Sequence, residues 1–173
     1  MTDITKRDES NSAILLEFDQ NAEDLWSQVR VRFRVEQTEL LMSLDEAGML
    51  ELGLPLFVPA FATFGMACLR LCRQIGHSAL NLDDYGHELL FKLKGDEVLV
   101  CSTMRRLTVA VDYDALFEAW ESFANHVKAI VTSKQPEKVN YGYWRLIDQD
   151  PDGLVAEELS GQSWFDERKD CFE

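Results

Sequence analysis

Residues 88–134 carry a hydrophobic pattern that alternates with a period of two and then changes to helical spacing. On either side of Gly95-Asp96, apolar residues alternate with charged ones, which is typical of an antiparallel hairpin joined by a two-residue turn. In that register Lys94 faces Glu97, and the apolar pairs lie together on the other face of the ribbon. The pattern predicts a meander with strands over residues 88–94, 97–103 and 107–111.

A long helix is expected to follow the last of these strands directly, over residues 113–133. Asp112 is its predicted N-cap, because an aspartate there accepts hydrogen bonds from the first turn, and because apolar residues stand where a hydrophobic staple needs them. The helix has one broad apolar face, made of Leu116, Trp120, Phe123, Val127, Ile130 and Val131. We expect this face to lie across the meander.

Two earlier segments also alternate with a period of two. Residues 13–18 predict a short first strand, and residues 29–35 form the strictest alternation in the chain and are placed in the same sheet as the meander. In the second segment the face opposite the core carries Arg30, Arg32 and Arg34. We expect these arginines to pair with carboxylates of a neighbouring strand rather than to bind an anion, because opposite charges across a sheet attract.

A second long helix, rich in phenylalanine, is predicted over residues 57–75. Pro55 and Pro59 mark its start, since proline is tolerated in the first turn of a helix and not later, and Gly76 is the expected C-cap. The sequence therefore predicts the α+β class, as a single domain over residues 1–173. In this domain two long helices pack on an antiparallel β-meander sheet.

The composition predicts a globular protein of the cytoplasm. Of the 173 residues 46% are hydrophobic, and no apolar run approaches the roughly 18–20 residues of a membrane span. Residues 1–12 are polar and are expected to be a flexible leader rather than a secretion signal. The cysteines at positions 68, 72, 101 and 171 are therefore expected to be reduced and structural.

No local motif predicts a cofactor, a metal or a catalytic centre. The three histidines are dispersed, and no phosphate-binding loop or nucleophile motif is present. Residues 148–153 repeat the first half of a calcium-binding loop, but Leu159 stands where the loop needs a bidentate glutamate, so an acidic turn is the stronger interpretation. An enzyme or small-ligand protein with a pocket between the helix 57–75 and the sheet is one alternative function, and a structural or assembly subunit is another.

The net charge is the feature of the composition that bears most directly on the choice of partner. A value of −14 disfavours nucleic acid and anionic membranes as partners and favours a basic protein. Residues 36–69 contain no Lys or Arg, so the acidic residues among them form an unbalanced surface. Its candidate partner-binding residues are Glu36, Glu39, Asp45 and Glu46. Residues 43–51 fit either a short helix with a capping box or a hairpin turn, and we expect the short helix.

The C-terminal extension, residues 136–173, combines carboxylates with aromatic residues. We expect it to dock on the body, because so many aromatic side chains are unusual in a linker. Its clustered carboxylates suit a cationic surface, and its aromatic residues suit the anchors of a protein interface. The candidate partner-binding residues are Tyr141, Tyr143, Trp144, Asp148, Asp150 and Asp152.

In size, acidity and expected architecture the chain resembles bacterial immunity proteins, which neutralise toxins that are often basic nucleases. The resemblance implies an inhibitor that works by binding another protein, without a cofactor and without catalysis. A basic protein partner, such as a toxin domain, is therefore the predicted ligand.

Overall fold

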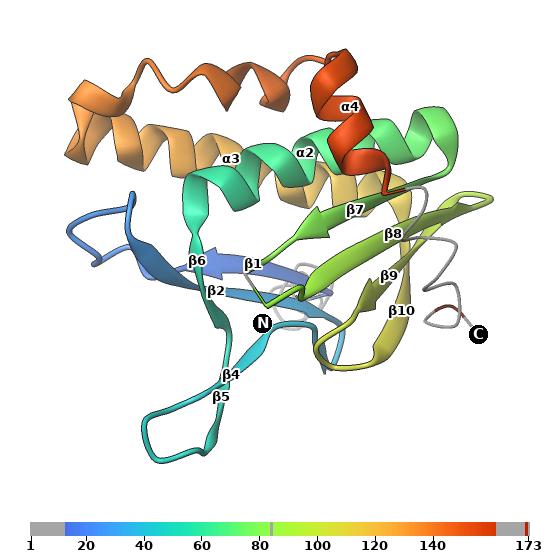
Figure 1. The fold of residues 1–173 in the computed structure, drawn as a ribbon, viewed down its shortest axis with the longest axis horizontal. Helices are drawn as coiled ribbons and strands as arrows, with labels where there is room; N and C mark the ends of the chain where they lie inside the picture. Colours follow the sequence, from blue (N-terminus) through green and yellow to red (C-terminus); the bar gives the residue numbers. More distant parts are fainter. Residues whose placement is uncertain (1–12, 84, 162–171, 173) are drawn as a thin grey trace, which may run out of the picture.

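The computed structural model describes residues 13–83, 85–161 and 172, which fold into antiparallel sheets packed against helices (Figure 1). The first sheet contains β1 (Ile14–Phe18), β2 (Gln28–Val35), β3 (Thr38–Glu39) and β6 (Leu54–Phe57). The second sheet contains β7 (His77–Asn81), β8 (Glu88–Lys94), β9 (Glu97–Ser102) and β10 (Leu107–Asp112). The α-helices of the described residues are α2 (Val58–Ile75), α3 (Tyr113–Lys134) and α4 (Gly153–Ser160). The predicted α+β class is confirmed.

The predicted meander is confirmed in the second sheet. Its strands run in the order β10-β9-β8-β7, each antiparallel to its neighbour. Lys94 pairs with Glu97 and Phe91 pairs with Val100, as the two-residue turn requires. Gly95 takes a φ of 63°, which a type II′ turn needs at its first loop position and which glycine adopts without strain.

Helix α3 begins and packs as the sequence predicts. The side chain of Asp112 accepts a hydrogen bond from the backbone N–H of Ala115 at 2.9 Å, which caps the first turn. Of the predicted apolar face, Ile130 is partly buried and the other side chains are buried. The amphipathic pattern therefore predicts the correct face of the helix.

Helix α2 starts and ends near the predicted residues. Pro59 lies in its first turn, whereas Pro55 belongs to strand β6. At the other end Gly76 adopts a left-handed φ of 92°, and its N–H donates to the carbonyl oxygen of Cys72. Among the described residues, no helix combines the length and the apolar character needed to cross a bilayer.

Helices α2 and α3 approach each other closely at Gly65. The indole N–H of Trp120 donates to the backbone carbonyl oxygen of Ala62 at 3.1 Å. A Cβ atom added at Gly65 would lie 2.1 Å from the same indole ring, which no packing tolerates. Glycine weakens a helix interior, and here the close contact between the two helices requires it.

The structure corrects the placement of residues 29–35 in the meander sheet. Strand β2 belongs instead to the first sheet, where it pairs with β1 on one side and with β3 and β6 on the other. Alternation specifies which side chains of a strand face the core, but it does not specify the neighbouring strands. The expected pairing of its arginines is confirmed for Arg32, which binds Glu17 of β1 and Glu39 of β3.

A hairpin replaces the short helix expected over residues 43–51. Strands β4 (Met42–Leu44) and β5 (Leu50–Leu52) pair in antiparallel register. The carboxylate of Asp45 accepts hydrogen bonds from two backbone N–H groups of the turn, and Gly48 adopts a φ of 80°. The short helix is therefore wrong, because the aspartate bonds the turn that the glycine allows and does not cap a helix.

After α3 the chain runs back along α2. The short 3-10 helices η1 (Pro136–Lys138) and η2 (Gly142–Ile147) precede α4, and both η2 and α4 contact α2. The buried side chains of this segment are Trp144, Leu146, Ile147, Val155 and Leu159. Residues 162–171 and the predicted leader over residues 1–12 lie outside the described residues.

The cysteines differ in redox state. Cys68 and Cys72 are free and buried in α2, as expected, and burial raises the pKa of the Cys72 thiol to about 12. Cys101 of β9 is disulfide-bonded, so the expectation of a reduced cysteine is wrong at this position. The physical reason is that a cross-link depends on which distant residues the fold brings together, and local sequence does not contain that information. Cys171 lies outside the described residues.

Candidate protein-binding surface

The hairpin of β4 and β5 projects from the body of the protein (Figure 1). Residues 42–52 form this hairpin arm. Its cross-strand pairs are Met42 with Leu52, Ser43 with Glu51, and Leu44 with Leu50. Because successive side chains of a strand point to opposite faces, one face of the arm is wholly apolar and the other is polar.

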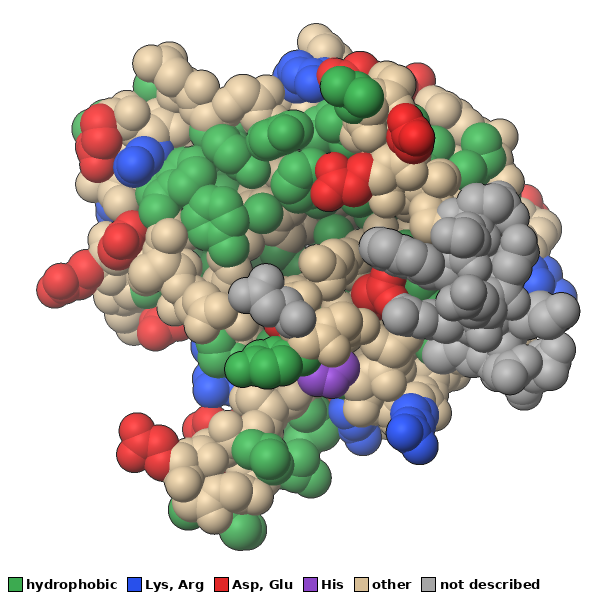
Figure 2. Space-filling model, viewed as in Figure 1, with side chains coloured by type: hydrophobic (Ala, Val, Ile, Leu, Met, Phe, Trp, Pro, Cys, Tyr) green, Lys and Arg blue, Asp and Glu red, His purple; other side chains and the backbone are tan. Residues whose placement is uncertain are grey.

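The apolar face of the hairpin arm is exposed to solvent. The exposed fractions are 65% for Leu44, 66% for Met49 at the end of the turn, 70% for Leu50 and 45% for Leu52. Figure 2 shows hydrophobic side chains gathered on the arm, with acidic side chains beside them. Large apolar side chains exposed together on a projecting element are typical of an interaction surface.

Arg30 of β2 holds the polar face of the hairpin arm against the body. Its guanidinium donates to the hydroxyl of Ser43 at 2.8 Å and to the carboxylate of Glu51 at 3.0 Å. It also donates to the backbone carbonyl oxygens of Leu52 and Gly53, both at 3.1 Å. These bonds hold the arm in one orientation and leave its apolar face turned away from the anchor.

Replacing Arg30 by methionine is expected to loosen the hairpin arm and to leave the core folded. Methionine keeps an apolar stem but supplies none of the four hydrogen bonds to the arm and its base. Backbone amides of residues 42–52 should then exchange with solvent about tenfold faster, whereas those of α3 keep the wild-type rate. The matched control is Arg32→Met, which removes ion pairs with β1 and β3 but no contact to the arm. Equal exchange of the arm in the two variants would contradict the anchoring role.

Uncompensated carboxylates lie in the turn of the hairpin arm and in the turn between β2 and β3 that precedes it in the chain. Glu39 and Glu51 are paired with arginines of β2. In the part of the chain that the structure describes, the acidic residues of this region without an ion pair are Glu36, Asp45 and Glu46. Residues 36–69 contain no Lys or Arg that would neutralise them. The arm therefore presents an apolar surface next to a local excess of negative charge.

The aromatic residues predicted as partner anchors in the C-terminal segment contact the body. Trp144 is only 4% exposed, and its ring centroid lies 5.3 Å from that of Tyr141. Tyr141 packs on Trp26 at 4.9 Å, and burial raises the pKa of Tyr141. The ring of Tyr143 lies 4.8 Å from that of Phe64 in α2 and keeps an exposed fraction of 38%. These side chains attach the segment to the body, and Tyr143 also faces solvent.

The predicted carboxylates of the same segment differ in their contacts. Asp152 caps α4 by accepting a backbone N–H of its first turn at 3.2 Å, and it also binds Arg145. Both contacts hold the pKa of Asp152 below its usual value. Asp150 lies 3.6 Å from the guanidinium of Arg70 in α2. Asp148 is exposed and has no ion pair with any described residue.

The partial calcium motif at residues 148–153 forms the start of α4. Asp152 is the N-cap of this helix and Gly153 is its first residue. A calcium ion would need the carboxylates of Asp150 and Asp152 as ligands. Here Asp150 pairs with Arg70, whereas Asp152 pairs with Arg145 and caps the helix. Within the described ranges, no group of three or more His, Cys, Asp or Glu side chains is placed to hold a metal ion.

A small hollow lies between the N-terminal half of α2 and the residues around the end of β7. Its volume is about 80 Å³, well below the roughly 300–1,000 Å³ of a usual ligand pocket. Its lining includes Phe57, Phe61 and Phe64, and Asn81 supplies its polar side chain. A small-ligand site or an active site at this place would need more space and more convergent polar groups than the hollow offers.

Comparisons with protein-family models, with curated proteins and with solved structures found no match to this chain. The class of this protein is therefore argued from its own structure alone. That structure is an α+β fold with a projecting hairpin arm that is apolar on one face and acidic at its turn.

Sequence reasoning misses the apolar side chains of the hairpin arm: Met42, Leu44, Met49, Leu50 and Leu52. A signal for them exists, because apolar and polar residues alternate on both sides of a turn that contains aspartate and glycine. The capping-box pattern from Ser43 to Glu46 hides this signal, since it uses the same residues.

Proposed function

We propose that the protein binds a basic protein partner and that the hairpin arm is the principal contact. The observation that carries the proposal is the apolar face of the arm, which is exposed and held outward by Arg30. A partner that covers this face needs an apolar depression. It also needs Lys or Arg around that depression to match the carboxylates of the arm.

Two physical contributions support binding through the hairpin arm. Complete burial of a Leu or Met side chain is worth roughly 1.5–3 kcal/mol, and four such side chains of the arm are 45% to 70% exposed. The hydrogen bonds of Arg30 order the arm before it binds, so little conformational entropy is lost in the complex. The net charge of −14 accelerates the encounter with a cationic surface.

The finer proposal is that the protein is an immunity-type inhibitor that neutralises a basic bacterial toxin in the cytoplasm. A toxin that acts on nucleic acid needs cationic residues near its active site to bind phosphates. An acidic arm that docks there competes with the nucleic acid for those residues and blocks its access. Tyr143 and Asp148 belong to the segment that runs along α2, on the other side of the body from the hairpin arm (Figure 1), so they lie outside an interface centred on the arm and their role in binding stays a prediction.

Site-specific photo-crosslinking tests the proposal by capturing the partner directly from the cell. A photoreactive amino acid replaces Leu50 in the arm, and a matched control places it at Leu154 of α4, which is 82% exposed. In the cells that produce the protein, we expect an adduct with one protein of high isoelectric point at Leu50 and not at Leu154. The association of that purified partner should slow as salt is raised. No adduct at Leu50, or identical adducts at both positions, contradicts the proposal.

A further inference from the structure

Strand β1 lies at an edge of the first sheet. Among the described residues it pairs with β2 alone. The hydrogen bond from the N–H of Asp19 to the carbonyl oxygen of Arg30 fixes which backbone groups face β2. Bonded and non-bonded pairs alternate along an antiparallel ladder, so the N–H and C=O groups of Ile14, Leu16 and Phe18 point away from β2.

The sequence of β1 leaves this edge unprotected. Exposed edges usually carry lysine, proline or a bulge, because unpaired N–H and C=O groups invite another strand. Strand β1 has the sequence Ile-Leu-Leu-Glu-Phe, and it pairs with β2 in an uninterrupted register. Neither lysine nor proline interrupts it. Such an edge is suited to bind an extended chain.

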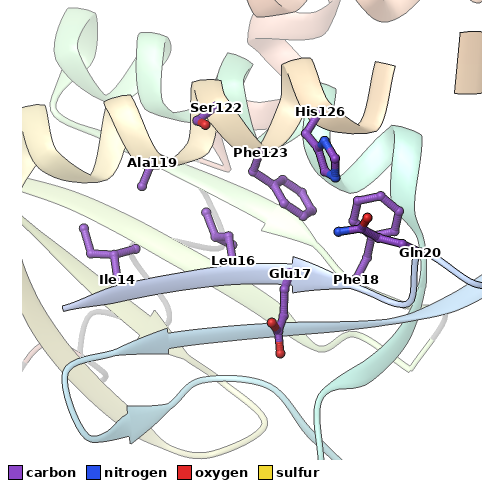
Figure 3. A pocket seen from close by; sticks show the side chains of 9 residues that line it. All are labelled: Ile14, Leu16, Glu17, Phe18, Gln20, Ala119, Ser122, Phe123 and His126. Atoms are coloured by element: carbon purple, nitrogen blue, oxygen red, sulfur yellow. The ribbon is translucent and has the colours of Figure 1, made fainter. Parts of the chain in front are cut away.

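A groove follows the same strand, between β1 and α3 (Figure 3). Its volume is about 420 Å³. The side chains that form its floor and its helical wall include Ile14, Leu16 and Phe18 from β1 and Ala119, Ser122 and Phe123 from α3. The small side chains of Ala119 and Ser122 leave space beside the strand. Ile14, Leu16 and Phe18, whose side chains line the groove, are thus the residues whose N–H and C=O groups point away from β2.

We infer that this groove binds an extended segment of another protein, which adds to β1 as a further strand. The outward N–H and C=O groups of β1 bond the backbone of the segment. Every second side chain of the segment enters the groove beneath α3, because side chains alternate between the faces of a sheet. The segment therefore has apolar residues at alternate positions. This inference is independent of the hairpin arm.

Charge distinguishes between the candidate occupants of the groove. Neither Lys nor Arg is among its described lining residues, and His126 of α3 supplies a neutral or cationic imidazole. The carboxylate of Glu17 points to the other face of β1, where it pairs with Arg32 (Figure 3) and would lie beside the polar positions of an added strand. Lys134, near one end, is already bonded to the carbonyl oxygens of Gln20 and Ala22. A second copy of the chain would bring another net charge of −14 to the groove and is repelled. The occupant is therefore a segment of a different protein that carries Lys or Arg among its polar positions.

Selection from a library of random octapeptides displayed on phage tests the inference on the full chain. Enriched peptides should alternate apolar with other residues and should carry Lys or Arg among the latter. The variant Ser122→Trp fills the groove from α3, and the control Asn125→Trp places the same side chain on the exposed side of the helix, outside the groove lining. An enriched peptide should bind Ser122→Trp about tenfold or more weakly than wild type, and Asn125→Trp with wild-type affinity.

Amide exchange then shows whether the peptide adds to the edge. With the enriched peptide bound, the amides of Leu16 and Phe18 should exchange about tenfold more slowly, whereas those of Leu15 and Glu17 already face β2 and should not change. The inference is overturned if no peptide is enriched above a blank surface, or if the two tryptophan variants bind alike. Protection of the Leu16 amide in the absence of peptide would also overturn the inference. So would a dimer in sedimentation that the Ser122→Trp substitution dissociates, because the occupant of the groove would then be a second copy of the chain.

Discussion

Replacing Trp120 by alanine is expected to lower the free energy of unfolding by about 3–5 kcal/mol. The side chain is fully buried, and its ring centroid lies 5.4 Å from that of Phe33, 4.9 Å from that of Phe61 and 6.2 Å from that of Phe91. These three residues belong to β2, α2 and β8. One side chain of α3 therefore contacts both sheets and the other long helix. Its removal leaves a cavity where these elements meet and deletes the indole hydrogen bond to Ala62.

Urea denaturation of wild type and variant measures this loss. The control Trp120→Phe keeps most of the ring volume and removes the hydrogen bond to α2, so its expected loss is smaller, about 1–2 kcal/mol. A loss below about 1 kcal/mol for the alanine variant would mean that the apolar face of α3 does not pack against the sheets.

Replacing Leu50 by aspartate is expected to weaken the complex with the basic partner about 100-fold or more. Leu50 is 70% exposed in the free protein and lies opposite Leu44 on the apolar face of the hairpin arm. In the complex the new carboxylate would enter an apolar contact, where an unpaired charge is costly. In the free protein it would face water, so the free energy of unfolding should change by less than about 0.5 kcal/mol.

The matched control for this binding prediction is Leu154→Asp. It makes the same chemical change at a site that is 82% exposed on α4, and it adds the same charge to the whole protein. Its Kd for the partner should equal that of wild type. If Leu50→Asp binds within about threefold of the control, which is less than 1 kcal/mol, the arm is not the principal contact.

The second sheet and the two long helices could be predicted because their signals are local. Asp112 caps α3 through a bond to its own first turn, and Gly95 and Gly76 adopt backbone angles that other residues avoid. In each case neighbouring residues decide the conformation. Sequence alone is sufficient for such elements.

The partners of distant strands could not be predicted from the same information. Strand β2 has the strongest alternation in the chain, yet its neighbours are decided by contacts with β1, β3 and β6. Gly65 is a weak helix residue in the sequence, and the ring of Trp120 that explains it comes from another helix. The disulfide state of Cys101 is a long-range property as well.

The negative charge of the candidate binding surface could be predicted from the sequence, but its shape could not. The excess of carboxylates over residues 36–69 follows directly from composition. The apolar face of the hairpin arm requires the register of β4 and β5, which the competing helix pattern conceals. The contacts of Asp150 with Arg70 and of Asp152 with Arg145 likewise depend on how the segment after α3 folds back.

Hydroxyl-radical footprinting of the complex with the crosslinked partner tests the role of the hairpin arm most directly. In the free protein Met49 and Leu50 should be labelled readily, since they are 66% and 70% exposed, and Tyr85, at 88%, serves as the internal reference. In the complex we predict that labelling of Met49 and Leu50 falls about tenfold while that of Tyr85 is unchanged, because an interface centre excludes water. Labelling of Met49 and Leu50 at the free-protein rate in a saturated complex would contradict the proposed binding surface.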